Sequence, residues 1–445
     1  MSAKKSYELM EKLSSLCKRR GFIFRSSEIY GGINGFWDYG PYGTEMKRAL
    51  EQLWWDYMVK NRNNVDGLDS TVICHPMVWK ASGHLDKFGD MMIDCKDCKA
   101  RHRQDQMEDD TVCPNCGSTN LTEPREFNLM MKTFVGPVFD EKHTAYLRAE
   151  TCQPIFADFH HVRIATRQKL PFGIAQIGKA FRNEINPRNY TFRSREFTQM
   201  EMEFFCKSED SMEWYEYWKA ERINYYKEFL GFTDDVMRIH PHGEGELAHY
   251  AKAALDIEFK FPFGWGELEG VHHRGNWDLS RHQEFSGENM EYFDQENNTK
   301  YIPTCIETSV GADRTLLAVL CNSYDEDTAE TKKEGKQQAA RVVLRLPKVI
   351  APVQVAVLPL SKKLGEQAEK LYVDIRKRFR SEFDITGSIG KRYRRQDEIG
   401  TPFCVTYDYE TIDDNAVTVR DRDSMTQDRV SIEQLTTYLD KKING

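Results

Sequence analysis

Apolar residues recur at helical spacing in two well-separated parts of the chain. Near the N-terminus, Leu9, Leu13 and Leu16 stand three or four positions apart among charged residues, a pattern that predicts an amphipathic helix. A longer helix is predicted over 210–230, where large aromatic residues fall roughly on one face: Trp214, Tyr217, Trp218, Tyr225 and Phe229. We interpret this stripe as core or subunit packing rather than as a cofactor site, because a buried helix face is the commoner use of such spacing.

Alternating positions predict two β-strands on either side of a short loop. The first covers 172–185 (FGIAQIGKAFRNEI), the second covers 195–206 (REFTQMEMEFFC), and the loop between them is 186–194 (NPRNYTFRS). Because side chains alternate between the two faces of a strand, one face of this hairpin is largely apolar and the other is polar. The polar face would present Arg182, Glu184, Phe197, Gln199, Glu201 and Glu203 together.

A polar, charged stretch divides the chain. Residues 325–340 (DEDTAETKKEGKQQAA) lack any large apolar side chain, as expected of a linker or an exposed turn. Beyond it, strands are predicted at 353–360, 401–409 and 416–420, and a helix at 362–383. Alternating strands and helices indicate a small α/β domain. The longer part before the linker is predicted to be an α+β domain that carries an insertion.

The composition is that of a globular protein. The 445 residues correspond to about three domain equivalents, and 40% of them are hydrophobic, enough for a large core. The 62 basic and 70 acidic residues give a net charge of −8, which excludes a generally cationic, histone-like nucleic-acid binder but is compatible with a local basic patch. No run approaches the about 18 apolar residues of a membrane span, so we expect no membrane insertion.

Eleven cysteines are present, and four of them form two CxxC pairs, Cys95 with Cys98 and Cys113 with Cys116. The other seven are scattered singly, which favours a reducing compartment. The N-terminal segment has no uninterrupted apolar stretch of signal-peptide length. We therefore expect a cytoplasmic protein.

Fourteen residues separate the two CxxC pairs, close to the spacing of a zinc ribbon. Four thiolates complete a tetrahedral shell and leave no open position, so a zinc ion here would be structural. Gly117 after the second pair would ease a tight turn. Four free thiols are the alternative interpretation.

Four arginines gather on and beside the hairpin loop: Arg182, Arg188, Arg193 and Arg195. The guanidinium fork suits phosphate oxygens, and Phe197 among them could stack on a base. Arginines, an aromatic ring and carboxylates together indicate a nucleotide site with a cationic second substrate. An amphipathic sheet with a solvated polar face is the alternative.

Three segments of the chain resemble, in order and spacing, the three motifs of the class II aminoacyl-tRNA synthetases. YGPYG around Pro41, before a predicted helix, resembles motif 1, the dimer-interface element. FRNE, a loop and RSREF (181–197) resemble motif 2, and ETSVGADRTLLAVL (307–320) resembles motif 3. The match extends to glycyl-tRNA synthetases of the homodimeric type through IYGGINGFWDYGPYG, LPFGIAQIGKAFRNEI, REFTQMEMEFF, KFPFGWGELEG and GKRYRRQDEIGTPFCVT, from about residue 6 to the C-terminus.

The resemblance implies an α+β fold: an antiparallel sheet flanked by helices, with the zinc-ribbon-like insertion, followed by a C-terminal α/β anticodon-binding domain. The expected domains are 1–340, with the insertion at about 85–135, and 341–445. The implied reaction is ATP-dependent attachment of glycine to tRNA(Gly) through a glycyl-adenylate, by a homodimer that uses ATP, Mg²⁺ and a structural Zn²⁺. The sequence has no G-x-G-x-x-G or P-loop motif where a nucleotide-binding strand–turn–helix would need one, which agrees with the implied antiparallel fold.

The resemblance implies roles at the ATP site. Arg182 would bridge the α-phosphate and the amino-acid carboxylate, and Arg314 would share the catalytic role from the far side of an adenine ring stacked on Phe197. Glu184 would read the adenine amino group, Arg193 would hold the γ-phosphate, and Glu267 and Leu268 would contact ATP, with the carboxylate acting through Mg²⁺. The whole implied ATP set is Arg182, Asn183, Glu184, Phe192, Arg193, Ser194, Arg195, Glu196, Phe197, Glu267, Leu268, Gly311, Ala312, Asp313 and Arg314.

Glycine offers no side chain to recognise, so the resemblance implies a filled, acidic pocket around its ammonium group. Arg103 would reach this pocket from the insertion, with Arg101 as the alternative. The sequence departs from the common family pattern at ETCQP (150–154) and ETSVG (307–311), both of which keep the glutamate. The implied glycine set is Arg103, Glu150, Phe197, Thr198, Gln199, Met200, Glu201, Glu307, Thr308, Ser309, Val310 and Gly311.

Two further features have competing interpretations. KRYRRQ (391–396) is either a solvated charged loop or, as the resemblance implies, a contact to anticodon phosphates. The basic residues 96–103 around the cysteines suit the tRNA acceptor end or a solvated face. All twelve histidines are assigned structural roles, because no carboxylate–histidine spacing indicates a metal site; the adjacent pairs 160–161 and 272–273 would diverge in strands.

Two other functions are considered beside glycine attachment. One is a catalytically silent synthetase-like subunit that binds nucleic acid, and the other is a class II synthetase for another amino acid. The first would lack the motif 2 and motif 3 arginines, whereas Arg182 and Arg314 are both present. The acidic pocket and the full-length resemblance disfavour the second.

Overall fold

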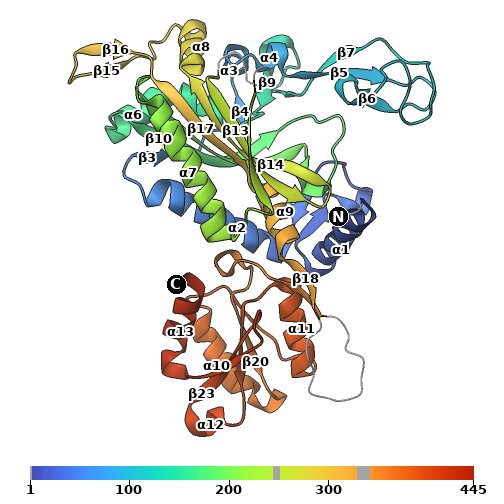
Figure 1. Ribbon diagram of the computed structural model, residues 1–445, viewed down its shortest axis with the longest axis vertical. Coiled ribbons are helices and arrows are strands. Elements are labelled where there is room, and N and C mark those ends of the chain that lie inside the picture. The colour runs from blue at the N-terminus through green and yellow to red at the C-terminus, as the bar shows by residue number, and fades with distance from the viewer. Residues whose placement is uncertain (1–2, 244–250, 328–340) are drawn as a thin grey trace.

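The computed structural model describes residues 3–243, 251–327 and 341–445, and its centre is a large, mostly antiparallel sheet (Figure 1). Within these residues the sheet has seven strands in the order β12-β13-β14-β17-β11-β10-β3, and only β10 and β3 run parallel. The bounds are β3 (Val65–Gly67), β10 (Phe172–Phe181), β11 (Glu196–Cys206), β12 (Met237–Pro241), β13 (Ala253–Phe261), β14 (Gly264–Gly275) and β17 (Thr304–Gly311).

Helices cover the apolar face of this sheet. The predicted helices are confirmed as α1 (Ala3–Arg20) and α7 (Ser211–Leu230). Helix α2 begins at Pro41, a position where the backbone N–H that proline lacks has no partner within the helix. One core joins side chains of these helices and of α9 to Met200, Met202 and Phe204 on β11. The helices α2 (Pro41–Trp55) and α9 (Ala312–Ser323) therefore lie directly behind the strands that carry the polar face.

The insertion projects as an arm from one end of the sheet, built on β5 (Gly89–Asp94), β6 (Arg101–Arg103) and β7 (Arg125–Asn128) (Figure 1). Short helices surround its root and the neighbouring end of the sheet. These are α3 (Pro76–Ala81), α4 (His84–Lys87), α5 (Cys152–Ala157), α6 (Phe159–Thr166) and α8 (Trp277–Ser286). The remaining short strands are β1 (Ile23–Arg25), β2 (Trp37–Tyr39), β4 (Ile73–Cys74), β8 (Met131–Phe134), β9 (Thr144–Leu147), β15 (Tyr292–Asp294) and β16 (Thr299–Tyr301).

The C-terminal part is a separate α/β unit with its own core. Its described residues form a sheet in the order β21-β20-β22-β23-β24, in which β20 runs parallel to both of its neighbours. The strands are β20 (Val355–Pro359), β21 (Ser381–Phe383), β22 (Phe403–Tyr407), β23 (Ala416–Asp421) and β24 (Gln427–Ser431). The helices are α10 (Gly365–Ile375), α11 (Ile389–Ile399), α12 (Thr411–Asp414) and α13 (Ile432–Asn444).

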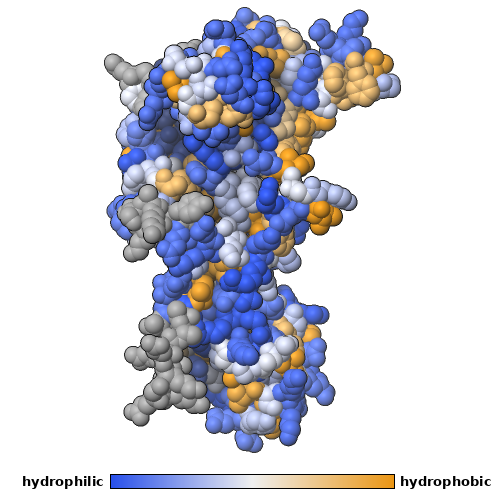
Figure 2. Space-filling model, turned by 90° about the vertical axis from the view of Figure 1, so that its right-hand side faces the viewer, coloured by the Kyte–Doolittle hydropathy of each residue, from blue (hydrophilic) through white to orange (hydrophobic). Residues whose placement is uncertain are grey.

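Figure 2 shows the molecule drawn in at a waist between these two parts, on a largely hydrophilic surface. Two side-chain hydrogen bonds bridge the junction. Tyr42 at the start of α2 donates to Glu382 (2.7 Å), and Arg20 at the end of α1 donates to Glu398 (2.5 Å). The C-terminal unit is thus held to the helices that lie behind the central sheet.

Four sequence predictions need correction. The first hairpin strand ends at Phe181 rather than at 185, because the backbone N–H of Asn183 donates to Leu129 instead of continuing the ladder. The helix predicted over 362–383 ends at Ile375, and Ser381–Phe383 form an edge strand, since short apolar runs fit both periods. The pair His160 and His161 lies on a helix, α6.

The fourth correction concerns the charged segments. Residues 391–396 belong to α11 rather than to a loop, and Arg392 is buried there, donating to the carbonyl oxygens of Pro359 and Asp384. Of the predicted linker, Tyr324–Asp327 form β18, which pairs with β19 (Arg341–Leu344). Residues 328–340 lie outside the described residues.

None of the helices described here combines the length and the apolar character that crossing a membrane requires.

Candidate active site

A cavity of about 300 Å³ opens on the polar face of the central sheet. The pairing of Gln199 with Gly311, Glu201 with Ser309 and Glu203 with Glu307 sets β11 and β17 side by side, so side chains of one parity from both strands share this face. The lining includes these residues of the predicted ATP and glycine sets: Glu150, Arg182, Glu184, Phe192, Arg193, Ser194, Phe197, Gln199, Glu201, Glu267, Glu307, Ser309, Gly311, Asp313 and Arg314.

The other predicted residues lie beside or behind the cavity. The side chains of opposite strand parity face the core, together with the first residue of α9; these are Thr198, Met200, Leu268, Thr308, Val310 and Ala312, all buried. Asn183, Arg195 and Glu196 lie at the edge, where Arg195 donates to the carbonyl oxygen of Glu184 (2.9 Å). Strand alternation explains why neighbours in sequence divide between the two faces.

Glu201 is the best-anchored carboxylate of the cavity. One oxygen accepts hydrogen bonds from the backbone N–H (2.9 Å) and the hydroxyl of Thr151, and the other accepts from Gln199 (2.8 Å) and Ser309. Burial, followed by the negative charges of Glu307 and Glu150, raises the pKa of Glu201 to about 7. Among the residues that the structure describes, the hydrogen-bond partners of this group are neutral donors, so its negative charge attracts an incoming ammonium.

Glu307 faces Glu201 from β17 and has cationic partners. It accepts from His272 (2.7 Å) and from Arg274 (3.1 Å), and Arg274 also binds Asp278 (2.7 Å). Burial would raise the pKa of Glu307, but Arg274 and His272 hold it below its ordinary value. A fully ionised carboxylate therefore lies next to one that titrates near neutrality.

Glu203 lies beneath this pair, fully buried. It accepts a hydrogen bond from the Cys305 thiol (3.0 Å), and burial together with the charge of Glu307 raises its pKa well above the usual value. We therefore treat Glu203 as a buried, protonated carboxyl group rather than as a negative charge that contacts a ligand.

Glu150 completes the acidic end of the cavity. Its carboxylate lies 3.3 Å from Nε2 of His84 and accepts from Gln153 (3.2 Å). Burial alone would raise the pKa of Glu150, but His84 and Arg274 hold it well below its ordinary value. The acidic end therefore combines two firmly ionised carboxylates with Glu201 between them.

Sequence reasoning missed several members of this site: His84, Thr151, His242, His272, Arg274 and Asp278. The sequence predicts structural roles for all histidines, but two of them, His242 and His272, line the cavity. Parity in GVHHRG does place His272 and Arg274 on one face and His273 on the other. The missing information was that β14 lies beside β17, where His272 pairs with Glu307.

The other end of the cavity is rich in arginine. Arg193 lies 3.3 Å from Glu184, and Arg314 donates to Glu267 (3.0 Å) and to the carbonyl oxygen of Phe192 (3.1 Å). These ion pairs orient the guanidinium groups around open space, where phosphate oxygens could take the place of the carboxylates.

The aromatic partners of the two predicted catalytic arginines differ. The guanidinium of Arg182 lies 5.4 Å from the centre of the Phe197 ring, whereas that of Arg314 lies 4.5 Å from the centre of the Phe192 ring. Arg314 thus already lies over one aromatic ring, that of Phe192, whereas the resemblance implies that it covers a base stacked on Phe197.

Asp313 lies at the cavity edge but is held from behind. Its carboxylate accepts from Lys47 of α2 (2.9 Å), from the hydroxyl of Tyr39 and from the backbone N–H of Thr198 (2.6 Å). Burial would raise the pKa of Asp313, but Lys47 keeps it below the ordinary value. This buried group ties α2, β11 and the start of α9 together and so fixes Arg314, the next residue.

The two arginines considered for the insertion have partners within the arm. Arg103 binds Asp90 (3.1 Å) and Asp105 (2.8 Å), while the exposed Arg101 lies 3.7 Å from Asp94. Neither lines the cavity among the described residues. A contact between Arg103 and glycine stays a prediction.

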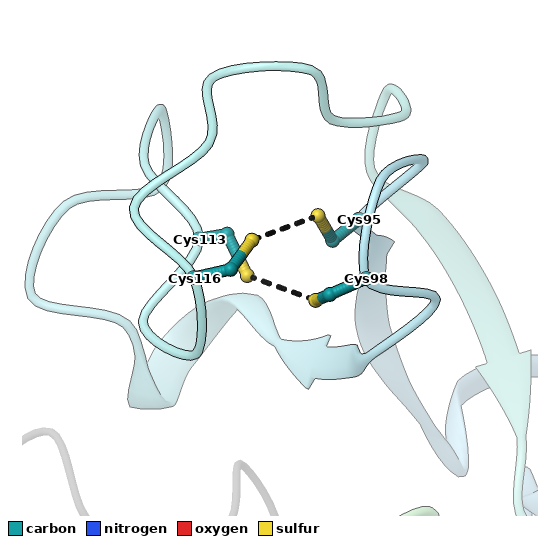
Figure 3. Close-up of side chains that lie close together, drawn as sticks. All are labelled: Cys95, Cys98, Cys113 and Cys116. Atoms are coloured by element: carbon teal, nitrogen blue, oxygen red, sulfur yellow. Dashed lines mark hydrogen bonds between the residues drawn. The ribbon is translucent and has the colours of Figure 1, made fainter.

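The four cysteines of the insertion converge beyond the far end of β5, away from the root of the arm (Figure 3). Their sulfur atoms all lie within 4.8 Å of one another, with Cys95 3.6 Å from Cys116 and Cys98 3.7 Å from Cys113. Four thiolates at about 2.3 Å from a zinc ion in a tetrahedron are separated by about 3.8 Å. Each CxxC pair forms a turn. Gly117, directly after the second pair, has a φ of +73°, a backbone conformation that favours glycine.

Comparison with known proteins gives two family matches. The model described as "tRNA synthetase class II core domain (G, H, P, S and T)" matches residues 134–323, and the model described as "Anticodon binding domain" matches residues 354–442.

Among the curated relatives, the glycine–tRNA ligase of Treponema denticola is 51% identical over 443 residues, covering 98% of this chain and 97% of its own length. That of Bacillus anthracis is 49% identical over 461 residues, covering 98% and 99%. That of Caldanaerobacter subterraneus subsp. tengcongensis is also 49% identical, covering 98% of both chains. The similarity therefore runs through the central sheet, the arm and the C-terminal unit.

Proposed function

The chain belongs to the glycine–tRNA ligases of the class II aminoacyl-tRNA synthetases, and from this premise we propose that it attaches glycine to tRNA(Gly) at the cavity described above. The observation that carries the proposal is the division of one cavity into a buried acidic end and an arginine-rich end. The acidic end suits an ammonium group, and the arginine-rich end suits a triphosphate.

The first step would join glycine to ATP. A carboxylate oxygen of glycine attacks the α-phosphorus, the bond to the β-phosphate oxygen breaks, and pyrophosphate leaves with the electron pair. Arg182 lies between the two ends and would bind both reacting groups, offsetting the charge that develops on phosphorus. Arg193 would bind the γ-phosphate, and Arg314 would cover the base stacked on Phe197.

The second step would transfer the glycyl group to tRNA. A ribose hydroxyl at the acceptor end attacks the carbonyl carbon and AMP leaves, so the protein needs no covalent intermediate. Glu201, Glu150 and Glu307 hold the ammonium throughout. Because the pocket is filled, we infer that larger amino acids are rejected by steric clash.

Magnesium fits the arginine-rich end by its donor set. Glu184 and Glu267 supply carboxylate oxygens there, the ligand type that Mg²⁺ prefers. A bound Mg²⁺ would neutralise phosphate charge, and these two carboxylates would hold the ion beside the arginines.

We propose that the chain is a cytoplasmic homodimer of the glycyl-tRNA synthetase type, with α2 and the segment before it as the motif 1 interface. The catalytic domain would comprise 1–340, with the insertion at about 85–135, and the anticodon-binding domain 341–445. In the latter, the exposed Lys391 on α11 is available to phosphates. Sedimentation velocity on the full chain tests the dimer, since a monomer would contradict it.

The function itself is tested by amino-acid-dependent ATP–pyrophosphate exchange with each of the twenty amino acids. We expect exchange with glycine, and much slower exchange with alanine and serine. Exchange with another amino acid would indicate a different class II synthetase, and no exchange at all would indicate a silent relative. Both of these alternatives are disfavoured by Arg182, Arg314 and the identities reported above.

We also propose that the four cysteines of the arm hold one structural zinc ion. The supporting observation is the separation of their sulfur atoms, which matches a tetrahedral thiolate shell. The ion would take no part in the reaction, because the four thiolates leave it no open position.

Replacing Cys95 and Cys113 together by Ser should release one zinc per chain and unfold the arm, because metal binding supplies about 10 kcal/mol or more of folding free energy to small thiolate sites. Elemental analysis and limited proteolysis measure both effects. Cys74→Ser, outside the cluster, is the matched control. A parent protein that contains no zinc after purification without chelators would contradict this assignment.

A further inference from the structure

A short turn at the root of the insertion arm contacts both ends of the cavity. It consists of α4 and the residue that follows it, Phe88, directly before the first strand of the arm. The strand that returns from the arm holds this turn in place. The side-chain amide of Asn128 donates to the carbonyl oxygens of His84 (3.0 Å) and Leu85 (3.3 Å). The backbone N–H of Leu129 donates to the carbonyl oxygen of Phe88 (2.9 Å).

His84 is fixed on all sides within this turn. Its ring packs between Trp79 and Phe88, with ring centres 5.3 Å and 4.8 Å away. Nδ1 lies 2.8 Å from the hydroxyl oxygen of Ser82, which leaves Nε2 facing Glu150 at 3.3 Å. The imidazole itself does not belong to the cavity lining, whereas Glu150 does. Any effect of His84 on a ligand must therefore act through Glu150.

Phe88 supports the other end. The guanidinium of Arg182 lies 5.3 Å from the centre of the Phe88 ring and 5.4 Å from that of Phe197, and its Nε donates to the carbonyl oxygen of Ala149 (3.0 Å). Two aromatic rings and one hydrogen bond thus hold the planar group. Only one of these rings, Phe197, belongs to the hairpin that carries Arg182.

We propose that His84 and Phe88 are positioning residues for the two substrates: His84 sets the carboxylate of Glu150 for the glycine ammonium, and Phe88 sets the guanidinium of Arg182 for the α-phosphate. This inference rests on the proposed function. It assigns to the root of the arm a separate role for each substrate, so that one turn aligns the two groups that must react.

The charges of the acidic end support the part played by His84. Glu150 lies near Glu201 and Glu307, and a third buried carboxylate that kept only its neutral donors Cys152 and Gln153 would take up a proton more readily. The contact with His84 opposes this, as the low pKa of Glu150 reflects. Removing the imidazole should therefore weaken the pocket for an ammonium while leaving the arginine-rich end unchanged.

The test compares variants of the full-length protein by glycine-dependent ATP–pyrophosphate exchange. His84→Phe keeps an aromatic ring between Trp79 and Phe88 but offers Glu150 no donor. We expect its KM for glycine to rise about ten- to a hundredfold, the range for a lost hydrogen bond to a charged group, with the KM for ATP within about twofold of the parent value.

Three companion variants separate positioning from general damage. His84→Gln can place a side-chain N–H where Nε2 lies and should recover most of the glycine affinity, whereas His84→Asn places its amide nearer Nδ1 and should not. Phe88→Leu should lower kcat, on which the loss of Arg182 itself would fall, with the KM for glycine near the parent value. His161→Phe, on an exposed site of α6, is the matched control.

Two results would overturn the inference. One is an unchanged KM for glycine in His84→Phe, and the other is an equal rise in both KM values in the His84 and Phe88 variants, which indicates a loosened fold. If His84→Phe does not fold, the comparison of His84→Gln with His84→Asn decides. A parent protein without glycine-dependent exchange would instead contradict the proposed function, and the positioning role would fall with it.

Discussion

Arg182→Ala should reduce glycine-dependent ATP–pyrophosphate exchange by about a thousandfold, because a preorganised group that offsets transition-state charge is worth about a hundred- to a thousandfold for a single donor and this guanidinium would bind both reacting groups. The loss should fall on kcat at saturating ATP and glycine. The two substrates would still bind at their own ends of the cavity, through Arg193 and Arg314 on one side and the glutamates on the other.

The fold should survive this change. Arg182 is half-buried, and its aromatic contacts are worth about 0.5–1 kcal/mol each. Arg238→Ala is a matched control, since Arg238 also stacks on an aromatic ring, that of Trp265 (4.4 Å), from the same sheet but outside the cavity lining. Exchange within tenfold of the parent value for Arg182→Ala, with normal thermal unfolding, would contradict the assigned role.

Glu201→Ala should weaken glycine strongly while ATP binding stays near the parent value. Truncating one partner of a buried charge pair costs about 2–5 kcal/mol, which corresponds to about a 30- to 5000-fold loss of glycine affinity. The geometry explains the direction. Four neutral donors hold the carboxylate in place, and none of its partners within the described part of the chain is a cation, so the ammonium of glycine supplies the positive charge.

Glu201→Gln separates charge from shape, because the amide has nearly the same size but carries no charge, and its NH2 group replaces one of the two acceptor oxygens. We expect a loss of glycine affinity in this variant as well, with little change in thermal stability. Glu258→Ala, on strand β13 of the same sheet and outside the cavity lining, is the control. An unchanged dependence on glycine in Glu201→Ala would move the amino-acid pocket elsewhere, while ATP binding, measured separately, shows that the variant is folded.

The sequence alone determined what depends on local spacing. The parity of the second hairpin strand places Phe197, Gln199 and Glu201 on one face, and all three line the cavity. The same holds for the strands β20, β22 and β23 of the C-terminal unit, and in part for the aromatic stripe of α7, where Trp218 and Tyr225 are buried but Tyr217 is exposed. These features follow from the periods of strands and helices, which are set by neighbouring residues.

What stayed ambiguous in the sequence were short segments at the ends of elements. The strand that stops at Phe181 and the edge strand Ser381–Phe383 are decided by partners far away in the chain. The first ends where Leu129 takes over the backbone hydrogen bonding, and the second forms because β20 has an open edge. No local pattern contains this information.

The tertiary structure decided which charges meet. Strand β17 lies between β11 and β14, so Glu307 is paired with Glu203 on one side and with His272 on the other, and the turn before the arm brings His84 to Glu150. Strand order and register are long-range properties, since a one-residue shift would turn every one of these side chains to the opposite face. The sequence by itself therefore determined the kinds of residues in the site, and only the folded sheet determined their partners and their state of ionisation.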